Sequence, residues 1–251
     1  MSQKVKLEYK LGQGDLSKYK TIVESTTEIN EEGETKTINS VMEMITTQTI
    51  TSVVADGSMG VEVAIDEATL KRDGEELPVP SVGQKIPMKM KKNGEVSQMG
   101  GAGAGAGGQT HASFPEEIVG VGDVWSGESN IEIPGTNKSV VLKTNHKLEA
   151  FETVKGYECA RIKVNTPETK IPLQEDVEQT IIVEGTTLFD HKEGRLVSSV
   201  AETKTWMNLP AGQSVKTSTK MIIEIEGEKK GGKPSTGGSI GLGDDFLMPS
   251  L

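Results

Sequence analysis

A run of glycine and alanine at residues 100–108, directly after Met99, divides the chain, and it constrains the fold more than any other stretch. Alternating glycine and alanine offers almost no side chain to bury, and glycine loses much conformational entropy when it is fixed. We therefore expect a flexible linker or a long loop here. The run contains the pattern G-x-G-x-x-G, but nucleotide-binding glycines need a strand before them and a helix after them. The residues that follow, 109–115, do not look like the start of a helix.

Three short landmarks before the run recur in the same order after it. They are Gly12-Gln-Gly14-Asp15 with Gly120-Val-Gly122-Asp123, Asp56-Gly57 with Lys155-Gly156, and Asn93-Gly94 with Glu193-Gly194. Each pair is separated by about a hundred residues, which is typical of a tandem repeat of one structural unit. We expect two units, residues 1–98 and 114–228, with residues 99–113 as the linker or loop between them. We interpret Asp15 and Asp123 as turn residues that bond to the local backbone, in preference to calcium ligands.

Hydrophobic periodicity predicts strands and very little helix. Apolar and charged residues alternate over residues 4–11, and within residues 217–226 the apolar residues Met221, Ile223 and Ile225 fall at every second position. Such alternation is typical of a half-buried strand. Residues 35–54 predict one long curved strand or two, whereas residues 68–72 allow a single helical turn. We expect an all-β fold, built as two tandem antiparallel curved β-sheet units.

Charge and hydropathy limit the classes of function. The formal net charge is −10, and an acidic surface repels phosphate backbones, so we expect no nucleic-acid binding. No apolar run approaches the ~20 residues of a membrane-spanning helix, so we expect no membrane span. The first residues lack the apolar core of a secretory signal. We therefore expect a cytoplasmic protein as the sequence is written, or a periplasmic or extracellular one if an export signal was removed.

Residues with catalytic or metal-binding chemistry are few and scattered. The histidines His111, His146 and His191 share no metal-ligand spacing, and Cys159 has no nearby partner for a metal site. Because Cys159 lies in an alternating segment, a buried thiol is favoured over a Cys–His nucleophile. The sequence has no nucleophile elbow, Walker loop or zinc-protease helix. We expect no enzyme, no metal and no cofactor; a hydrolase with two carboxylates facing a cleft is the catalytic alternative.

Methionine is concentrated in the first unit, and it supplies the candidate ligand-binding residues. Met42, Met44, Met88 and Met90 occupy alternating positions along two expected strands. Methionine adapts to varied apolar partners, so these side chains either fill the core or line an apolar groove on a concave sheet face. In the second interpretation they bind an apolar ligand, either lipid-like or a peptide.

The segment 229–251 has the composition of a linker and ends in apolar residues. Apolar side chains at the tip of such a tail need a partner to cover them. Ile240, Leu242, Phe246 and Leu247 are the candidates for docking on a protein partner, and a frayed terminus is the alternative. The peptide Ser239-Ile-Gly-Leu-Gly243 resembles the targeting peptides that tether cargo inside encapsulin shells. That resemblance implies a cargo or adaptor protein docked to a larger assembly.

Two longer motifs carry a family resemblance. The first is Leu7-Glu-Tyr-Lys-Leu-Gly-Gln-Gly-Asp15, and the second is Val119-Gly-Val-Gly-Asp-Val-Trp125 followed later by Tyr157-Glu-Cys-Ala-Arg-Ile162. Together they resemble an uncharacterised family of bacterial β-rich proteins, usually exported or lipid-anchored, in the curved-sheet style of lipoprotein carriers. The motifs are structural, so the resemblance implies no catalytic residue. The main hypothesis is a non-catalytic binding or structural protein that holds an apolar ligand on a concave sheet face.

Overall fold

The computed structural model describes residues 3–99, 113–132, 139–174 and 177–230, and it confirms the all-β prediction. The strands are β1 (Lys4–Val5), β2 (Leu16–Glu31), β3 (Glu34–Val53), β4 (Met59–Arg72), β5 (Glu75–Leu77), β6 (Lys85–Met90), β7 (Val96–Met99), β8 (Val119–Gly120), β9 (Val124–Glu132), β10 (Ser139–Val154), β11 (Tyr157–Asn165), β12 (Thr169–Gln174), β13 (Val177–Asp190), β14 (Arg195–Asn208) and β15 (Ser214–Lys229). The one helical element in these residues is a 3-10 turn at Pro210–Gly212. None of the described segments forms a helix long and apolar enough to cross a membrane.

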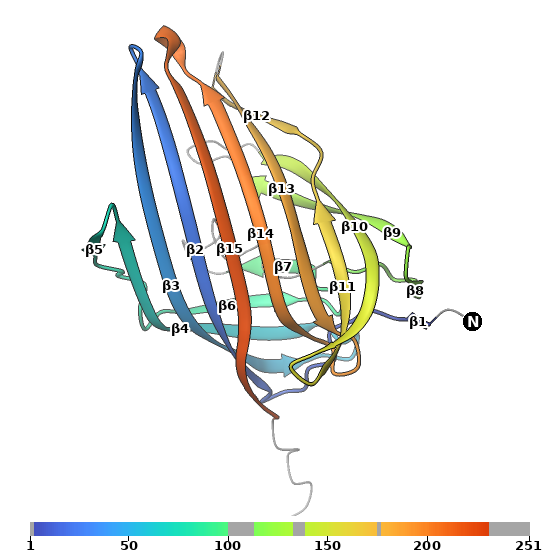
Figure 1. The fold of residues 1–251 in the computed structure, drawn as a ribbon. Coiled ribbons are helices and arrows are strands. Elements are labelled where there is room, and N and C mark those ends of the chain that lie inside the picture. Colours follow the sequence, from blue (N-terminus) through green and yellow to red (C-terminus); the bar gives the residue numbers. More distant parts are fainter. Residues whose placement is uncertain (1–2, 100–112, 133–138, 175–176, 231–251) are drawn as a thin grey trace, which may run out of the picture.

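Thirteen strands form one curved antiparallel sheet, while β1 and β8 pair in a separate two-stranded ribbon (Figure 1). The order along the sheet is β7-β6-β4-β3-β2-β15-β14-β13-β11-β10-β9, with β5 on β4 and β12 on β13. Strands β7 and β9 end the described sheet and are not paired with each other, so the sheet is open. The long central strands β3, β2, β15, β14 and β13 rise side by side in Figure 1.

The same strand order occurs twice in this sheet. Strands β2, β3, β4, β6 and β7 of the first half are neighbours in the same order as β9, β10, β11, β13 and β14 of the second half. Strand β15 joins the halves because it pairs with β2 on one side and with β14 on the other. The linker at 99–113 and the tail at 229–251 lie largely outside the described residues, so the domain division stays a prediction.

The repeated Gly-x-Gly-Asp landmark makes the same hydrogen bonds in both halves. The Asp15 carboxylate accepts from the Gly12 amide at 2.8 Å, and the Asp123 carboxylate accepts from the Gly120 amide at 2.9 Å. The backbone carbonyl of each aspartate also accepts from an amide of the neighbouring long strand, β3 or β10, at 2.9 and 3.0 Å. These are the local backbone bonds that the turn interpretation requires.

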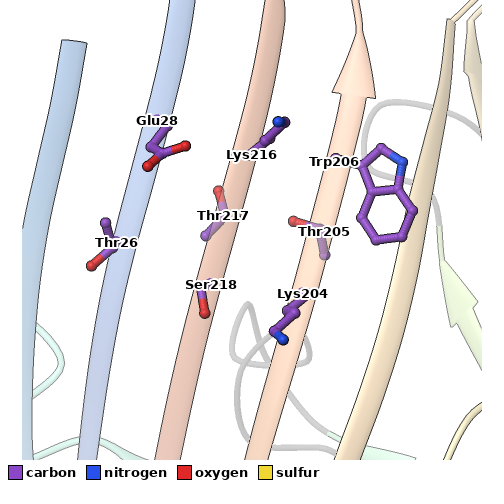
Figure 2. A pocket seen from close by; sticks show the side chains of 8 residues that line it. All are labelled: Thr26, Glu28, Lys204, Thr205, Trp206, Lys216, Thr217 and Ser218. Carbon is purple, nitrogen blue, oxygen red and sulfur yellow. The ribbon is translucent and has the colours of Figure 1, made fainter. Parts of the chain in front are cut away.

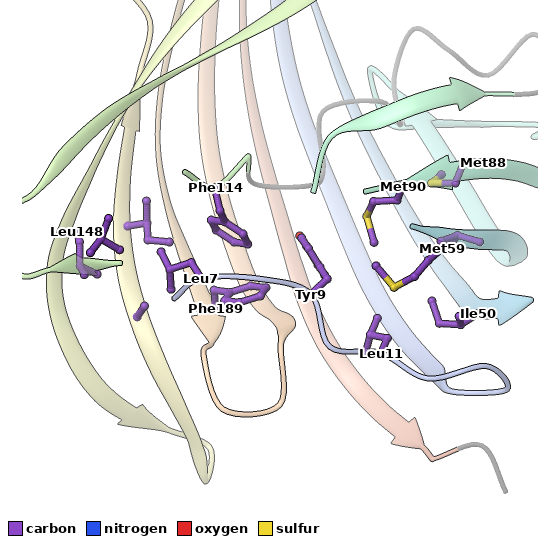
Figure 3. Packing of buried hydrophobic residues seen from close by; sticks show 14 residues of the cluster. Leu7, Tyr9, Leu11, Ile50, Met59, Met88, Met90, Phe114, Leu148 and Phe189 are labelled. Atoms are coloured by element: carbon purple, nitrogen blue, oxygen red, sulfur yellow. The ribbon is translucent and has the colours of Figure 1, made fainter. Parts of the chain in front are cut away.

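One end of the concave face of the sheet is packed. The side chains that meet there come from the N-terminal segment, from Phe114 and from strands of both halves (Figure 3). This cluster, the packed end, consists of Leu7, Tyr9, Leu11, Ile50, Met59, Val61, Met88, Met90, Phe114, Val119, Leu148, Ala160, Ile162 and Phe189. The ring of Phe189 lies 5.0 Å from that of Tyr9 and 4.4 Å from that of Phe114, as measured between centroids.

The prediction of a strand over residues 4–11 is wrong beyond its first two residues, although the apolar side chains of this segment are buried as the alternation suggests. Its backbone bonds to turns instead of to a neighbouring strand. The Tyr9 amide donates to the Lys92 carbonyl at 2.7 Å, and the Lys10 amide donates to the Gly194 carbonyl at 3.1 Å. These turns belong to the β6–β7 and β13–β14 hairpins. In the repeated strand order, β6 and β7 of the first half correspond to β13 and β14 of the second half. The segment therefore ties the two halves together.

Strand pairing decides two further predictions about the first half of the chain. Strand β3 is one strand from Glu34 to Val53, in line with the first of the two interpretations. Residues 68–72 form no helical turn; they continue β4, because they pair with β3 on one side and with β5 on the other. The tight turn at Asp73 and Gly74, both with positive φ, returns the chain as a hairpin.

Candidate ligand-binding face

Beyond the packed end, the concave face continues over the five central strands. Every second side chain of a strand points to the same face, and the pairing register sets them side by side. Met42, for example, lies opposite Val23, which in turn lies opposite Met221. We call this surface the open face. It comprises Ile38, Ser40, Met42 and Met44 on β3, Val23, Ser25, Thr27 and Ile29 on β2, Val215, Thr217, Thr219 and Met221 on β15, Ala201, Thr203, Thr205 and Met207 on β14, and Ile181 and Val183 on β13, all of them half-buried.

No residue of the open face carries a charge, although Lys36, opposite Ile29, and Arg72 of β4, opposite Ser40, lie at its margin; the convex face of the same strands is charged. On the convex side, exposed Glu24 and Glu28 alternate with the open-face residues of β2, and exposed Lys216 and Lys220 alternate with those of β15. None of the open-face residues belongs to the packed end or packs against it, but Met221 packs against a second buried cluster that includes Tyr19, Ile223 and Ile225. A half-exposed uncharged surface of this width indicates contact with something other than water.

Hydroxyl groups on the open face bond to one another across the strands. The side-chain oxygens of Ser25 and Thr219 are 3.2 Å apart, and those of Thr27 and Thr217 are 3.1 Å apart. Each of these hydroxyls therefore already takes part in one hydrogen bond, which reduces its need for a polar partner from a ligand. The threonine methyl groups remain available for contact, so the face is less polar than its serine and threonine content suggests.

The four methionines predicted to bind a ligand fall into two groups. Met88 and Met90 belong to the packed end, with 9% and 0% of their surface exposed, and they fill the core. Met42 and Met44 lie half-buried on the open face, two positions apart on β3. The structure therefore does not bring all four into one site, and the binding role of Met42 and Met44 stays a prediction.

Sequence reasoning missed the part of the open face that comes from the second half of the chain. Met207 and Met221 lie on β14 and β15, far from Met42 in sequence, and only the β15–β2 pairing brings them to the same surface. The sequence pattern that could have identified these residues is the alternation of uncharged residues within each of these strands. It shows which side chains of one strand share a face, but it does not show which strands lie beside it.

The candidate docking residues Ile240, Leu242, Phe246 and Leu247 lie outside the described residues. The same holds for the peptide that resembles encapsulin-targeting sequences. Docking of a protein partner through the tail therefore stays a prediction, as does the role of a cargo or adaptor protein.

His146 on β10 is a buried histidine on the concave side. Its ring stacks on Trp125, with centroids 5.4 Å apart, and burial lowers the pKa of His146 to about 4. The Thr144 hydroxyl donates to the Gly127 carbonyl at 3.3 Å, so its oxygen accepts from His146 Nε2–H at 3.1 Å. That tautomer leaves Nδ1 as a buried acceptor with no partner among the described residues. Near pH 7 the neutral ring adds no charge to the concave side.

Cys159 is a buried thiol, in agreement with the interpretation of its alternating segment. Burial raises the pKa of Cys159 to about 11, so the thiol stays protonated near pH 7. No hydrogen bond joins it to His146 or His191 in the described part of the chain. Within that part, His, Cys, Asp and Glu side chains form no group of three that could hold a metal ion.

Comparison with known proteins gives a likeness in fold. No family model matches the chain, and no curated protein is similar to it. Among solved structures, one of lipovitellin that concerns its lipid–protein interactions matches with a TM-score of 0.50 and 9% identity. That match covers 92% of this chain, which spans only 27% of the lipovitellin chain. The curved-sheet architecture is therefore shared with part of lipovitellin.

Two bacterial structures superpose less well. An outer membrane lipoprotein-sorting protein domain from Vibrio parahaemolyticus has a TM-score of 0.16 and 10% identity, covering 88% of this chain and 87% of its own. A DUF1329 family protein from Desulfovibrio piger has a TM-score of 0.17 and 12% identity, covering 82% of this chain and 85% of its own. Superpositions of this quality carry no argument, so the family resemblance of the sequence stays a prediction.

Proposed function

We propose that this chain is a non-catalytic binding protein that holds an apolar, lipid-like ligand on the open face. The observation that carries the proposal is the absence of charge among the half-exposed open-face residues on five adjacent strands. Covering such a surface removes apolar area from water, which is worth about 25 cal/mol per Å². The convex face of the same strands offers no comparable gain, because charged side chains lose their hydration when they are covered.

Two further observations support an apolar ligand. In the pairs Ser25–Thr219 and Thr27–Thr217 each hydroxyl already takes part in one hydrogen bond, so an apolar ligand leaves none of them without any hydrogen bond. The second is the likeness in fold to lipovitellin, whose structure concerns lipid–protein interactions. The identity of 9% limits that likeness to the fold, so the chemistry of the open face carries the argument.

The test uses the full chain and a pyrene-labelled long-chain alcohol, with binding followed by pyrene fluorescence. Thr27 and Thr26 are adjacent on β2, are chemically identical and point to opposite faces. We expect Thr27→Lys to weaken binding at least about tenfold, equivalent to 1.4 kcal/mol, because the ligand would bury an unpaired ammonium group. Thr26→Lys, the matched control on the convex face, should bind as the unmodified chain does.

Three outcomes would count against the proposal. Equal affinities for both variants would remove the open face as the site, and loss of binding in Thr26→Lys alone would move the ligand to the convex face. No binding to the unmodified chain would also contradict it.

Mass spectrometry of the ligand after incubation tests the non-catalytic part of the proposal. We expect the alcohol and its long-chain esters to be recovered unchanged.

We also infer that the two halves descend from one duplicated unit of five strands. The repeated strand order and the matching Gly-x-Gly-Asp hydrogen bonds support this origin. Equivalent positions should then respond alike, so we expect Asp15→Ala and Asp123→Ala to lower the free energy of unfolding by a similar amount, about 1–2 kcal/mol each. Urea denaturation measures both; a loss confined to one of the two would argue against equivalent roles.

A further inference from the structure

Trp206 gives the convex face a second feature, although the hollows beside it also take in Thr205, Thr217 and Met207 of the open face. It lies on β14, and the register places it opposite Lys216 of β15 and Thr180 of β13. The indole is half-buried, and no described aromatic ring stacks on it. Figure 2 shows its ring on the side of β14 that faces β13, while the labelled side chains of β15 and β2 lie on the other side of β14. An indole left partly exposed on a charged face is therefore available to a ligand.

Two hollows in the surface meet at Trp206. The first, of about 480 Å³, extends across β14, β15 and β2 and is lined by Thr26, Glu28, Lys204, Lys216 and Ser218 among others (Figure 2). The second, of about 660 Å³, extends across β14, β13 and β12, where Glu168, Lys170, Glu178 and Thr180 contribute to its lining. Both volumes fall within the range of small-molecule sites. The indole is the aromatic side chain that the two hollows share.

The charges around the indole are balanced. Three lysines, Lys170, Lys204 and Lys216, and three glutamates, Glu28, Glu168 and Glu178, line the two hollows. A polyanion such as a nucleic acid is disfavoured by the glutamates and by the formal net charge of −10. A purely apolar ligand is disfavoured because it would strip water from six charged groups. The lining suits a neutral ligand with many hydrogen-bonding groups.

We propose that Trp206 is the platform of a binding site for a neutral oligosaccharide. The apolar face of the indole would pack against the C–H face of one sugar ring. Lysine ammonium groups donate to sugar hydroxyls, and glutamate carboxylates accept from them. The ion pair between Lys170 and Glu178, at 3.2 Å, is exposed, so both groups can exchange partners at low cost. Hollows on both sides of the indole leave room for the sugar rings that follow.

The site is tested by titrating the full chain with neutral hexasaccharides of glucose, xylose and N-acetylglucosamine, with binding read by calorimetry and tryptophan fluorescence. The chain has two tryptophans, and the Nε1–H of Trp125 donates to the Ser113 carbonyl at 2.9 Å on the concave side. In a Trp125→Phe background the fluorescence change should therefore persist, because it reports Trp206. We expect at least one of these sugars to bind.

Substitution of the platform provides the decisive comparison. Trp206→Ala should weaken sugar binding at least about tenfold, whereas Trp206→Phe should retain part of the affinity. Met42→Lys, which changes the open face on β3 away from both hollows, should leave sugar binding unaffected, so this proposal and the apolar-ligand proposal can fail separately. Failure of every hexasaccharide to bind at millimolar concentration, or equal binding by Trp206→Ala, would overturn the proposal.

Discussion

The packed end and the open face are two regions of one concave surface, and they differ in what lies on them. Met90 in the packed end has 0% of its surface exposed, while Met42 on the open face is half-buried. Both sit on alternating strands of the same sheet. The packed end is covered by residues 7–11 and by Phe114, which belong to no strand of that sheet. The alternation along a strand thus determines on which face of the sheet a side chain lies. Whether another segment packs over that face determines whether the side chain is part of the core.

This difference separates stability from binding within one sheet. The packed end removes large side chains from water and holds the turns of both halves through Tyr9 and Lys10. The open face leaves its apolar area available. We therefore expect substitutions at the packed end to act on folding, and substitutions on the open face to act on ligand binding.

The largest contrast is expected between Phe189→Ala and Met42→Ala. Phe189 is 0% exposed and contacts the rings of Tyr9 and Phe114, so its truncation leaves a cavity and should lower the free energy of unfolding by about 3–5 kcal/mol. Met42 is already half-exposed, and its truncation should cost about 1 kcal/mol. Urea denaturation monitored by circular dichroism measures both. Similar losses would show that the open face is packed as tightly as the covered end.

The second contrast concerns the contact between the N-terminal segment and the β13–β14 turn. Gly194 has a φ of 68°, and a Cβ there would lie 2.4 Å from the Lys10 amide nitrogen. Gly212 has a φ of 78°, and a Cβ added there would have no atom within 4 Å outside its chain neighbours. We expect Gly194→Ala to cost about 2–4 kcal/mol, from steric displacement added to backbone strain. Gly212→Ala should cost only the strain, about 1–2 kcal/mol, and equal losses would mean that the N-terminal segment contributes little.

A third contrast uses pH to probe the buried histidine. The pKa of His146 is about 4 in the folded chain and 6.5 when it is unperturbed, so the unfolded chain binds the proton more readily. Stability should therefore fall as pH drops from about 6.5 towards 4, by at most about 3 kcal/mol at 1.4 kcal/mol per pKa unit. His146→Phe should flatten this dependence in urea denaturation at a series of pH values. Burial also lowers the pKa of His191, so part of the slope should remain.

The smallest effect on stability is expected on the open face. In the double variant Thr27→Val and Thr217→Val, both partners of one hydroxyl pair become apolar groups of the same shape. Replacing both partners together should change the free energy of unfolding by less than about 1 kcal/mol. Binding of the pyrene-labelled alcohol should be retained or strengthened. Weaker binding would show that the ligand hydrogen-bonds to these hydroxyls, contrary to an apolar contact.

Local features of the fold followed from the sequence. The alternation in residues 157–165 and the Asn93-Gly94 turn correspond to β11 and to the β6–β7 hairpin. The alternation in residues 4–11 identified which side chains are buried, but not the partner of the backbone. That partner is a pair of turns far away in sequence, and such contacts leave no periodic signal.

The open face was only partly foreseeable from the sequence. Met42, Met44, Met88 and Met90 share one pattern, and nothing in that pattern says which of them residues 7–11 and Phe114 will cover. The pairing of β15 with β2 joins strands from opposite ends of the chain, so the open-face residues of the second half could not be assigned to the same surface.

Methionine methyl groups report on both regions at once, so their NMR spectrum tests the central claim most directly. The full chain, labelled at the methionine methyl carbons, would be titrated with an unlabelled long-chain alcohol. We expect the signals of Met42, Met44 and Met207 on the open face to shift, and those of Met59 and Met90 in the packed end to stay in place. Shifts confined to Met59 and Met90, or no shift at a saturating concentration of the alcohol, would contradict the account.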